Sequence, residues 1–207
     1  MHQGTDEWRM ARLGRVTASR IADVCARTKS GWGASRSNYM AQLICERLTQ
    51  VPAESFTNAA MVHGIDTEPQ ARAAYEFLTD NPVTEVALVD HPTIPMSSAS
   101  PDGLVGADGM VEIKCPNSAT HISTLLKETV DRKYMLQMQW QMACAERQWC
   151  DFVSFDPRLP TELQMWVKRI ERNDDMIAET EDIVREFLAE VDKTVADLRA
   201  KYMRDAA

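Results

Sequence analysis

The sequence predicts a single α/β domain with a central mixed β-sheet flanked by helices, and three observations support this prediction. The chain has 207 residues, which is the size of one ordinary domain. Its composition, 44% hydrophobic and 26% charged, is typical of a globular protein. Helical patterns lie at both ends, whereas short alternating segments broken by Pro and Gly fill the middle. We therefore expect a helical part over residues 1–80, a sheet core over 85–170 and a C-terminal helix over 173–204.

The N-terminal part contains four helical patterns. The first covers residues 6–13, and the second begins at Thr17. A loop over 29–35, rich in Gly and Ser, precedes a third helix over 37–49. The fourth is expected to enter at Thr67-Glu68-Pro69-Gln70 and to end near residue 78, because Pro is tolerated in the first turn of a helix.

The middle and the C-terminal part alternate between strand and helix patterns. Asn173 or Asp174 caps the last helix, which carries a long apolar stripe. The expected strands cover residues 85–90, 95–98, 104–105, 110–114, 149–155 and 163–170, and the expected helices between them cover 118–128 and 130–147.

Composition excludes several classes of protein. No stretch approaches the roughly 18 apolar residues that span a bilayer. The first ten residues lack the apolar core of a signal peptide, so we expect a protein inside a cell. The five cysteines are an odd number without a CxxC pair, which argues against a disulfide framework and a structural zinc site.

The net charge of −8 argues against a protein that coats nucleic acid through a global basic field. The charge is uneven, however, since residues 1–50 carry +4 and residues 171–207 carry −5. This distribution is compatible with a local site for a polyanion at the basic end. The alternative is that each end simply presents a solvated helix surface.

The candidate catalytic residues lie in two neighbouring segments, 100–103 and 110–116. In a strand, Glu112 and Lys114 face the same side because side chains alternate. A three-residue hairpin loop over 107–109 would set Asp102 across from Lys114, on the face of Glu112. A two-residue loop at Asp108-Gly109 would turn Asp102 to the other face. A lone Glu-x-Lys pair is also common on the solvent-exposed face of an ordinary strand.

Two carboxylates with a nearby carbonyl suit a hard divalent cation such as Mg²⁺, with Mn²⁺ as a substitute. Such a metal polarises a phosphate, helps to deprotonate an attacking water and offsets charge on the leaving oxygen. A lysine beside it can orient or deprotonate that water, provided the cation lowers its pKa. An acid followed by acid-x-Lys on adjacent strands is the signature of the PD-(D/E)XK nuclease superfamily, a short pattern that also occurs by chance.

The surroundings narrow the match, because the sequence resembles the phage lambda exonuclease family, the nucleases of viral-type recombination systems. Six blocks agree in order over nearly the whole chain. They are Trp8 with Arg12-Leu13-Gly14 and Thr17-Ala18-Ser19; Gly64 with Glu68; Ser100-Pro101-Asp102-Gly103; Glu112-Ile113-Lys114-Cys115-Pro116; Tyr134-Met135-Leu136-Gln137-Met138-Gln139; and Phe155-Asp156-Pro157-Arg158. The resemblance implies a restriction-endonuclease-like nuclease core.

The resemblance also implies a role for particular residues. Asp102 and Glu112 would bind the metal with the Ile113 carbonyl, and Lys114 would activate the nucleophilic water. Glu68 matches an additional acid near the metals, and Gln137 matches a glutamine that positions the attacking group. By themselves, Glu68 could merely favour a helix N-terminus, and Gln137 could make a core hydrogen bond.

A 5′-phosphate pocket is implied at Arg12, Ser19 and Ser100. An arginine with hydroxyls near a helix N-terminus is a good anion site, although Arg12 alone is usually a surface residue and Ser19 a capping hydroxyl. The loop that holds Lys29 and Trp32 matches a family loop that reaches DNA. Lys29 would contact the backbone and Trp32 could stack on a base, although a loop tryptophan more often packs against its own domain.

One departure from the family pattern lies after the Glu-x-Lys strand. The family has an arginine there that attracts phosphate, whereas residues 117–121 contain none. His121 is the nearest candidate for that role.

The resemblance implies a metal-dependent exonuclease that digests linear double-stranded DNA from 5′ to 3′, releases 5′-mononucleotides and leaves 3′ overhangs for recombination. It further implies a ring-shaped homotrimer, a single-strand annealing protein as partner, no membrane, and the cytoplasm of a bacterial host of a phage or prophage. The alternatives are an endonuclease of the same superfamily and a non-catalytic DNA-binding or assembly module.

Overall fold

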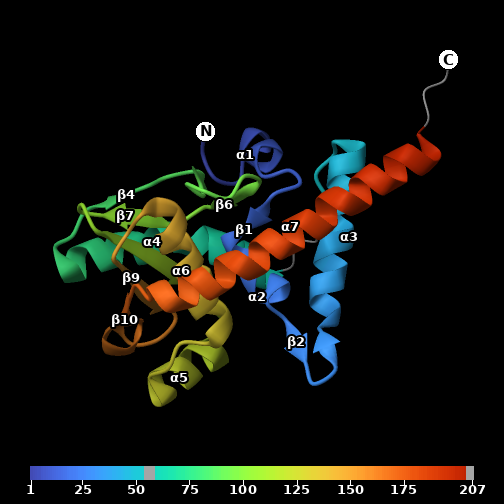
Figure 1. Ribbon diagram of the computed structural model, residues 1–207. Coiled ribbons are helices and arrows are strands. Elements are labelled where there is room, and N and C mark those ends of the chain that lie inside the picture. The colour runs from blue at the N-terminus through green and yellow to red at the C-terminus, as the bar shows by residue number, and fades with distance from the viewer. Residues whose placement is uncertain (54–58, 204–207) are drawn as a thin grey trace.

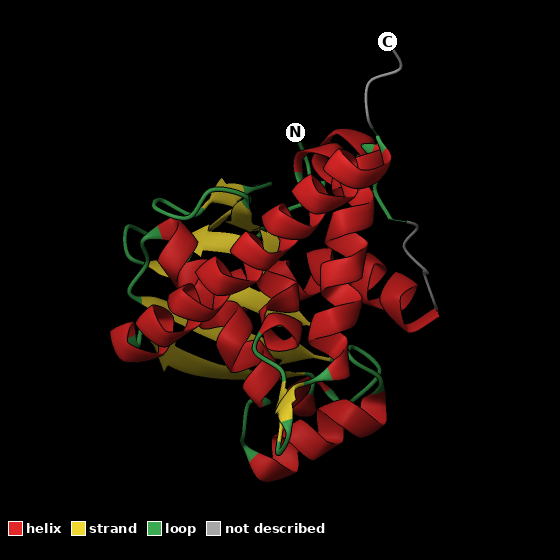
Figure 2. Cartoon of the chain, turned by 45° about the vertical axis from the view of Figure 1, so that its right-hand side comes forward, coloured by secondary structure: helices red, strands yellow, loops and turns green. Residues whose placement is uncertain are grey.

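The main sheet has five strands and lies in the left half of the molecule as seen in Figures 1 and 2. The computed structural model describes residues 1–53 and 59–203. In spatial order the strands are β10 (Met165–Glu171), β9 (Trp149–Phe155), β8 (Gly109–Lys114), β7 (Gly103–Val105) and β4 (Val83–Thr84). The strands β8 and β9 are parallel, and the other neighbours are antiparallel. The predicted mixed sheet is therefore confirmed.

Two smaller β elements accompany the main sheet. A three-stranded sheet orders β1 (Val16–Thr17), β6 (Ser97–Ala99) and β5 (Val89–Asp90), with β1 and β6 parallel. The hairpin of β2 (Arg27–Thr28) and β3 (Gly31–Trp32) stands apart from both sheets. The predicted loop over 29–35 is thus partly a hairpin.

Seven α-helices lie in the described residues, and their order matches the predicted one. They are α1 (Asp6–Ala11), α2 (Ile21–Val24), α3 (Ala34–Thr49), α4 (Ala59–Thr79), α5 (Ser118–Lys127), α6 (Arg132–Ala145) and α7 (Asp174–Tyr202), with 3₁₀ turns η1 (Ala18–Arg20) and η2 (Thr161–Leu163). Asn173 caps α7 by accepting the Met176 N–H at 2.9 Å. Residue 204, the predicted end of this helix, lies outside the described residues.

The helices α4 and α6 cover opposite faces of the main sheet. Ala71 and Tyr75 of α4 pack against Val111 and Ile113 of β8. On the other face, α6 packs its methionines against the alternate residues of the same strands, as Met138 and Met142 contact Met110, Cys150 and Phe152. The strand β8 is thus buried on both sides, and its even-numbered side chains point toward α6.

The opposite side of α6 faces the helical part of the molecule. Leu136, Trp140 and Cys144, spaced four residues apart, join the core cluster that contains Val184 and Phe187 of α7. Figure 1 shows α7 running across the molecule to α3. Because α6 lies between the sheet and α7, the residues between its two apolar faces, Gln137, Gln139 and Gln141, are buried as well.

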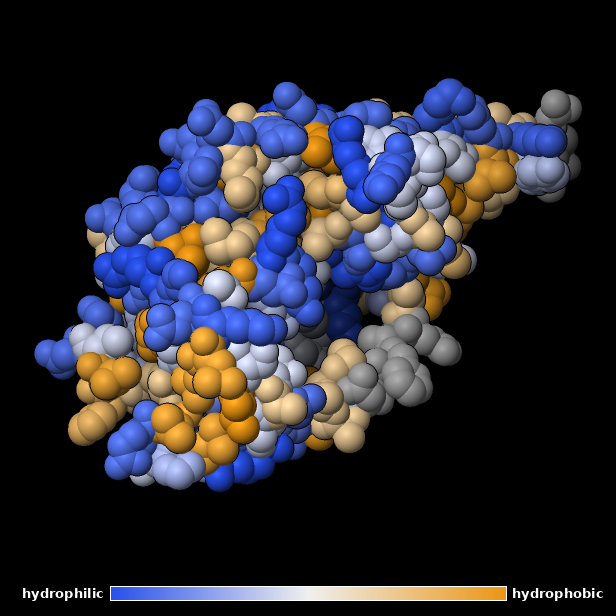
Figure 3. Space-filling model, turned by 90° about the horizontal axis from the view of Figure 1, so that it is seen from below, coloured by the Kyte–Doolittle hydropathy of each residue, from blue (hydrophilic) through white to orange (hydrophobic). Residues whose placement is uncertain are grey.

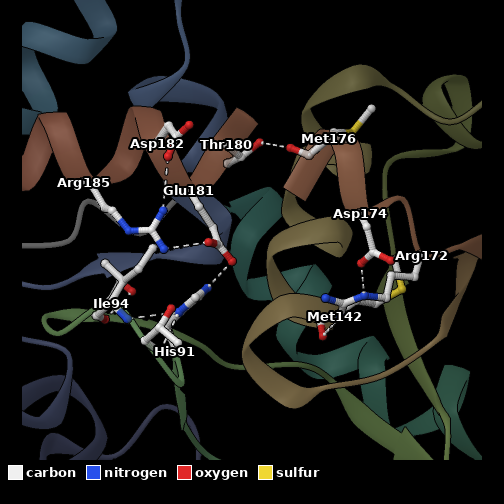
Figure 4. Close-up of polar contacts among 12 residues, drawn as sticks. His91, Ile94, Met142, Arg172, Asp174, Met176, Thr180, Glu181, Asp182 and Arg185 are labelled. Carbon is white, nitrogen blue, oxygen red and sulfur yellow. Dashed lines mark hydrogen bonds and ion pairs between the residues drawn. The ribbon is translucent and has the colours of Figure 1, made fainter. Parts of the chain in front are cut away.

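A polar cluster ties α7 to the loop after β5 (Figure 4). The buried His91 places Nε2 3.3 Å from Glu181 Oε1, and Arg185 donates to Glu181 Oε2 at 2.7 Å. His91 Nδ1 accepts the backbone N–H groups of Thr93 and Ile94, at 3.3 and 3.2 Å, so the proton of the neutral ring is on Nε2. Burial lowers the pKa of His91 despite the carboxylate of Glu181.

Two predicted helix starts are wrong. Thr17 ends strand β1, and the chain continues through the 3₁₀ turn η1 into the four-residue helix α2. The helix α4 already contains Ala59, so Pro69 lies in its interior and Glu68 is far from an N-terminus. The residues before Gly64 include good helix formers, which propagate the helix past the glycine and the proline.

The surface seen from below is mainly hydrophilic, and apolar residues gather in several places on it, most broadly at the lower left of the view (Figure 3). In the described part of the chain, no helix combines the length and the apolar character that crossing a membrane requires.

Candidate active site

The hairpin of β7 and β8 brings Asp102 to Glu112. Gly103 pairs with Val111 and Val105 with Gly109, so the loop covers residues 106–108 and Gly106 has a φ of 54°. The predicted loop over 107–109 is therefore wrong by one residue, and the register by two. A shift of two keeps the face of every side chain, so Asp102 stays on the face of Glu112 and stands one position before Gly103, across from Glu112.

The carboxylate of Glu112 is the most tightly held group of the site. It is 1% exposed, and Lys114 Nζ contacts its Oε1. Gln137 donates to Oε1 and Gln141 donates to Oε2, each at 2.6 Å. The structure thus brings the predicted Gln137 to the site and adds Gln141, which sequence reasoning missed. The i, i+4 spacing of the two glutamines was the available signal.

Asp102 and Glu68 share the electrostatic environment of Glu112. Asp102 Oδ2 accepts the backbone N–H of Ile113 at 2.7 Å. Burial, together with the charge of Glu112, raises the pKa of Asp102 well above its ordinary value. Burial and Glu112 also raise the pKa of Glu68, although Arg72, which donates to Glu68 Oε1 at 2.7 Å, opposes the shift.

Lys114 is held as an ammonium ion between these acids. Burial by itself would lower the pKa of Lys114, but the charges of Glu112 and Asp102 outweigh it and raise that pKa above its ordinary value. In this arrangement Lys114 donates hydrogen bonds. A role as proton acceptor would require that a cation first offset the two carboxylates.

The residues at this site fit a hard divalent cation. Asp102 and Glu112 supply oxygen ligands, and their mutual repulsion in a buried space is what such a cation would neutralise. In the described ranges no three His, Cys, Asp or Glu side chains group into a complete ligand set. Two acids with water completing the shell suit Mg²⁺, which keeps several of its waters. The Ile113 carbonyl stays a predicted ligand.

Arg12 and Ser100 of the predicted phosphate pocket meet. Arg12 donates to Ser100 Oγ at 3.1 Å, and Trp8 Nε1 donates to the same oxygen at 3.0 Å. The Arg12 guanidinium lies over the Trp8 ring, 4.1 Å from its centroid. Burial lowers the pKa of Arg12, which keeps its charge all the same. The side chain of Ser19 is exposed and makes no hydrogen bond within the described residues, and no long helix begins beside it.

The predicted DNA-facing loop is the β2–β3 hairpin. Lys29 is exposed in its turn. Trp32 is half-buried, with the guanidinium groups of Arg27 and Arg36 4.3 and 4.2 Å from its ring centroid. Arg36 is itself bidentate to Glu190 of α7, both contacts being 3.0 Å. The Trp32 ring is therefore packed within its own domain.

His121 does not replace the missing family arginine. Its side chain is fully buried, with Nδ1 2.7 Å from Ser154 Oγ and Nε2 2.9 Å from the Leu163 carbonyl oxygen. The carbonyl requires a proton on Nε2, so Nδ1 accepts from the serine. Both nitrogens are used inside the fold, and the proposed phosphate-attracting role of His121 is wrong.

Comparisons with known proteins agree with this geometry. The YqaJ-like viral recombinase domain matches residues 7–148. An alkaline exonuclease from Laribacter hongkongensis is 55% identical in a match that covers 95% of this chain and 97% of that chain, with a TM-score of 0.89. The structure of that exonuclease in complex with dAMP gives a TM-score of 0.90. No curated protein sequence matches significantly.

A more distant structure shares the fold alone. A phage related exonuclease from Haemophilus somnus 129PT is 14% identical, with 89% of this chain and 96% of that chain covered and a TM-score of 0.73.

Proposed function

Because the chain belongs to the YqaJ-like viral recombinase family, that of phage lambda exonuclease, we propose that this nuclease is a metal-dependent 5′-to-3′ exonuclease of linear double-stranded DNA. It releases 5′-mononucleotides and leaves 3′ single-stranded overhangs for recombination by strand annealing. The dAMP complex of the Laribacter relative supports a mononucleotide product.

The observation that carries the proposal is the segment 100–102. Ser100 Oγ accepts from Arg12, while Asp102, two residues later, accepts the Ile113 N–H beside Glu112. The Arg12 guanidinium and the acidic site are thus joined by one short stretch of chain. Gln3 holds this stretch as well, since its Nε2 donates to the Pro101 carbonyl at 2.9 Å. This arrangement suits an enzyme that binds a terminal phosphate and cleaves next to it.

Each group has a part in the reaction. Arg12 and Ser100 bind the 5′ phosphate, and Ser19 is a further candidate ligand for it. Asp102 and Glu112 hold Mg²⁺ or Mn²⁺, with the Ile113 carbonyl and Glu68 nearby. When bound, the metal polarises the scissile phosphate and favours deprotonation of the attacking water.

Two side chains orient the water and the acids. Lys114 points its ammonium into the acidic site and orients the water for attack. Gln137 keeps the Glu112 carboxylate in place. Lys29 and Trp32 belong to the hairpin that faces DNA.

The assembly is part of the proposal. Three copies form a ring around the DNA, and the product strand passes to a single-strand annealing protein in the cytoplasm of the bacterial host of the phage or prophage. The basic residues 1–50 face the DNA, and the acidic remainder limits non-productive contact.

Digestion of matched DNA forms tests the proposal. Linear duplex and closed circles are incubated with Mg²⁺ or with a chelator, and linear duplex is used with and without a 5′ phosphate. We expect mononucleotides from phosphorylated linear ends only, and only with the metal. Internal cuts in closed circles would instead indicate an endonuclease, and no digestion under any metal would indicate a DNA-binding or assembly module.

A further inference from the structure

The buried side of α6 holds a polar side chain that the proposed reaction does not use. We propose that Gln141 is a positioning residue that fixes the Glu112 carboxylate in the orientation that binds a divalent cation, and so sets the affinity of the site for the metal. This inference rests on the proposed function, since it takes Glu112 as a metal ligand.

Within residues 1–53 and 59–203, Gln141 is the one side chain that donates a hydrogen bond to Oε2 of Glu112. Oε1 of Glu112 accepts a hydrogen bond from Gln137 and forms the ion pair with Lys114. Oε2 receives Gln141 alone among the described residues, at 2.6 Å. With donors at both oxygens the carboxylate cannot rotate, whereas Gln137 and Lys114 together restrain only one end. Losing Gln141 frees the rotation and leaves the other contacts in place.

The hydrogen bond to Glu112 fixes the orientation of the Gln141 amide but leaves its oxygen without a partner in the described part of the chain. Gln141 is 0% exposed, and its Oε1 has no hydrogen-bond partner in the described part of the chain. A buried acceptor without a partner destabilises the folded protein, because it has lost its hydrogen bonds to water. Flipping the amide would place Oε1 against Glu112 Oε2, where two acceptors repel each other. The carboxylate therefore fixes which way the amide points.

Packing alone does not account for an amide at this position. The neighbouring positions that face the sheet on α6 are Met138 and Met142, both fully buried. An apolar side chain in place of Gln141 would avoid the unsatisfied acceptor. The gain that offsets this cost is the hydrogen bond to Glu112, since outer partners of a ligand fix its orientation and tune metal affinity.

Gln139 provides a matched control on the same helix. It is 2% exposed, donates to the Glu171 carbonyl and accepts the Asn173 N–H, both at 2.8 Å. These contacts join β10 to α7 and do not touch Glu112. Gln139→Met and Gln141→Met make the same chemical change in one buried helix. Only Gln141→Met removes a hydrogen bond to the Glu112 carboxylate.

Calorimetric titration with Mn²⁺ and with Mg²⁺, without DNA, tests the proposal. We expect Gln141→Met to weaken binding by about 10–100-fold, the usual effect of removing an outer partner of a metal ligand. Gln139→Met should lower the unfolding temperature and leave metal binding unchanged. In nuclease assays, Gln141→Met should require more Mg²⁺ for half-maximal rate and recover its rate at high Mg²⁺.

Equal metal affinity in the wild type and in Gln141→Met would overturn the inference, as would an equal loss in Gln139→Met. If Gln141→Met does not fold, Gln141→Asn replaces it, because its amide is one methylene too short to reach Glu112 and the same weakening is expected. A wild-type chain that binds neither cation would contradict the proposed function itself and remove this inference with it, a result distinct from wild-type binding that Gln141 does not affect.

Discussion

Replacing Asp102 with Asn should stabilise the metal-free protein and abolish the stabilisation that Mg²⁺ provides. The pKa of Asp102 is raised by burial and by the charge of Glu112, so the environment in the folded protein disfavours the ionised form of this carboxyl. Asn has nearly the same shape and still accepts the Ile113 N–H through its carbonyl oxygen. The substitution therefore removes the repulsion and keeps the hydrogen bond.

The expected gain in the free energy of unfolding follows from removing one buried carboxyl group. Relieving one destabilised functional group commonly adds about 0.5–2 kcal/mol, and each kcal/mol moves the unfolding temperature of a chain of this size by about 2–4 °C. In a chelator, Asp102→Asn should thus unfold about 1–8 °C above the wild type. At Mg²⁺ near one hundred times its Kd, the wild type gains about 2.7 kcal/mol and the variant little, so the order reverses.

The pH dependence has a definite sign. Because the folded pKa of Asp102 lies above its unfolded value near 3.8, the destabilisation is absent at pH below that value and grows as the pH rises through the folded pKa. The advantage of the variant in chelator should disappear in acid.

Thermal unfolding by circular dichroism, with and without Mg²⁺, measures all three expectations. Asp108→Asn, in the exposed hairpin loop, is the control for loss of one charge. A variant less stable than the wild type in chelator, or equally stabilised by Mg²⁺, would refute the reasoning.

The remaining predictions concern single side chains. Lys114→Ala should lower cleavage by about 10²–10⁴-fold while anisotropy shows that DNA still binds, and retained cleavage would contradict its role. Arg12→Ala should lose the preference for 5′-phosphorylated over 5′-hydroxyl ends, measured as a ratio of digestion rates, and an unchanged ratio would remove it from the pocket. The pKa of His91 is lowered from 6.5, so the free energy of unfolding measured in urea should fall as the pH drops below about 6.5 toward the folded pKa. His91→Gln should reduce this dependence of stability on pH. The same pH dependence in the variant and the wild type would refute the assignment of the effect to His91. Gly109→Ala should cost about 1–3 kcal/mol in urea unfolding, because its Cβ would lie 2.1 Å from the Trp149 ring, and unaltered stability would contradict the close contact.

The strand pattern made the centre of the site predictable, even though the hairpin loop was placed one residue too late. Side chains alternate with a period of two, so a register error of two residues leaves Asp102 and Glu112 on one face. The C-terminal limit of β9 was also predictable, because Asp156-Pro157 follows the strand directly. The α/β class followed from the same patterns.

Features that depend on packing between distant segments could not be predicted. The hydrogen bond of Gln141 to Glu112 depends on how α6 lies on the sheet, and Trp8 meets Ser100 only because α1 is folded back onto that segment. The length of α4 was missed because Pro69 suggested a first turn, whereas tertiary packing of Ala71 and Tyr75 and the good helix formers before Gly64 sustain the helix.

End polarity on labelled duplex DNA tests the central claim most directly. One linear duplex carries a distinct label at each 5′ and each 3′ end, with 5′ phosphates and Mg²⁺ present. The account predicts immediate release of the 5′ labels as mononucleotides, while the 3′ labels stay on lengthening single strands. Release of the 3′ labels first, or of labelled oligonucleotides from internal cuts, would contradict it.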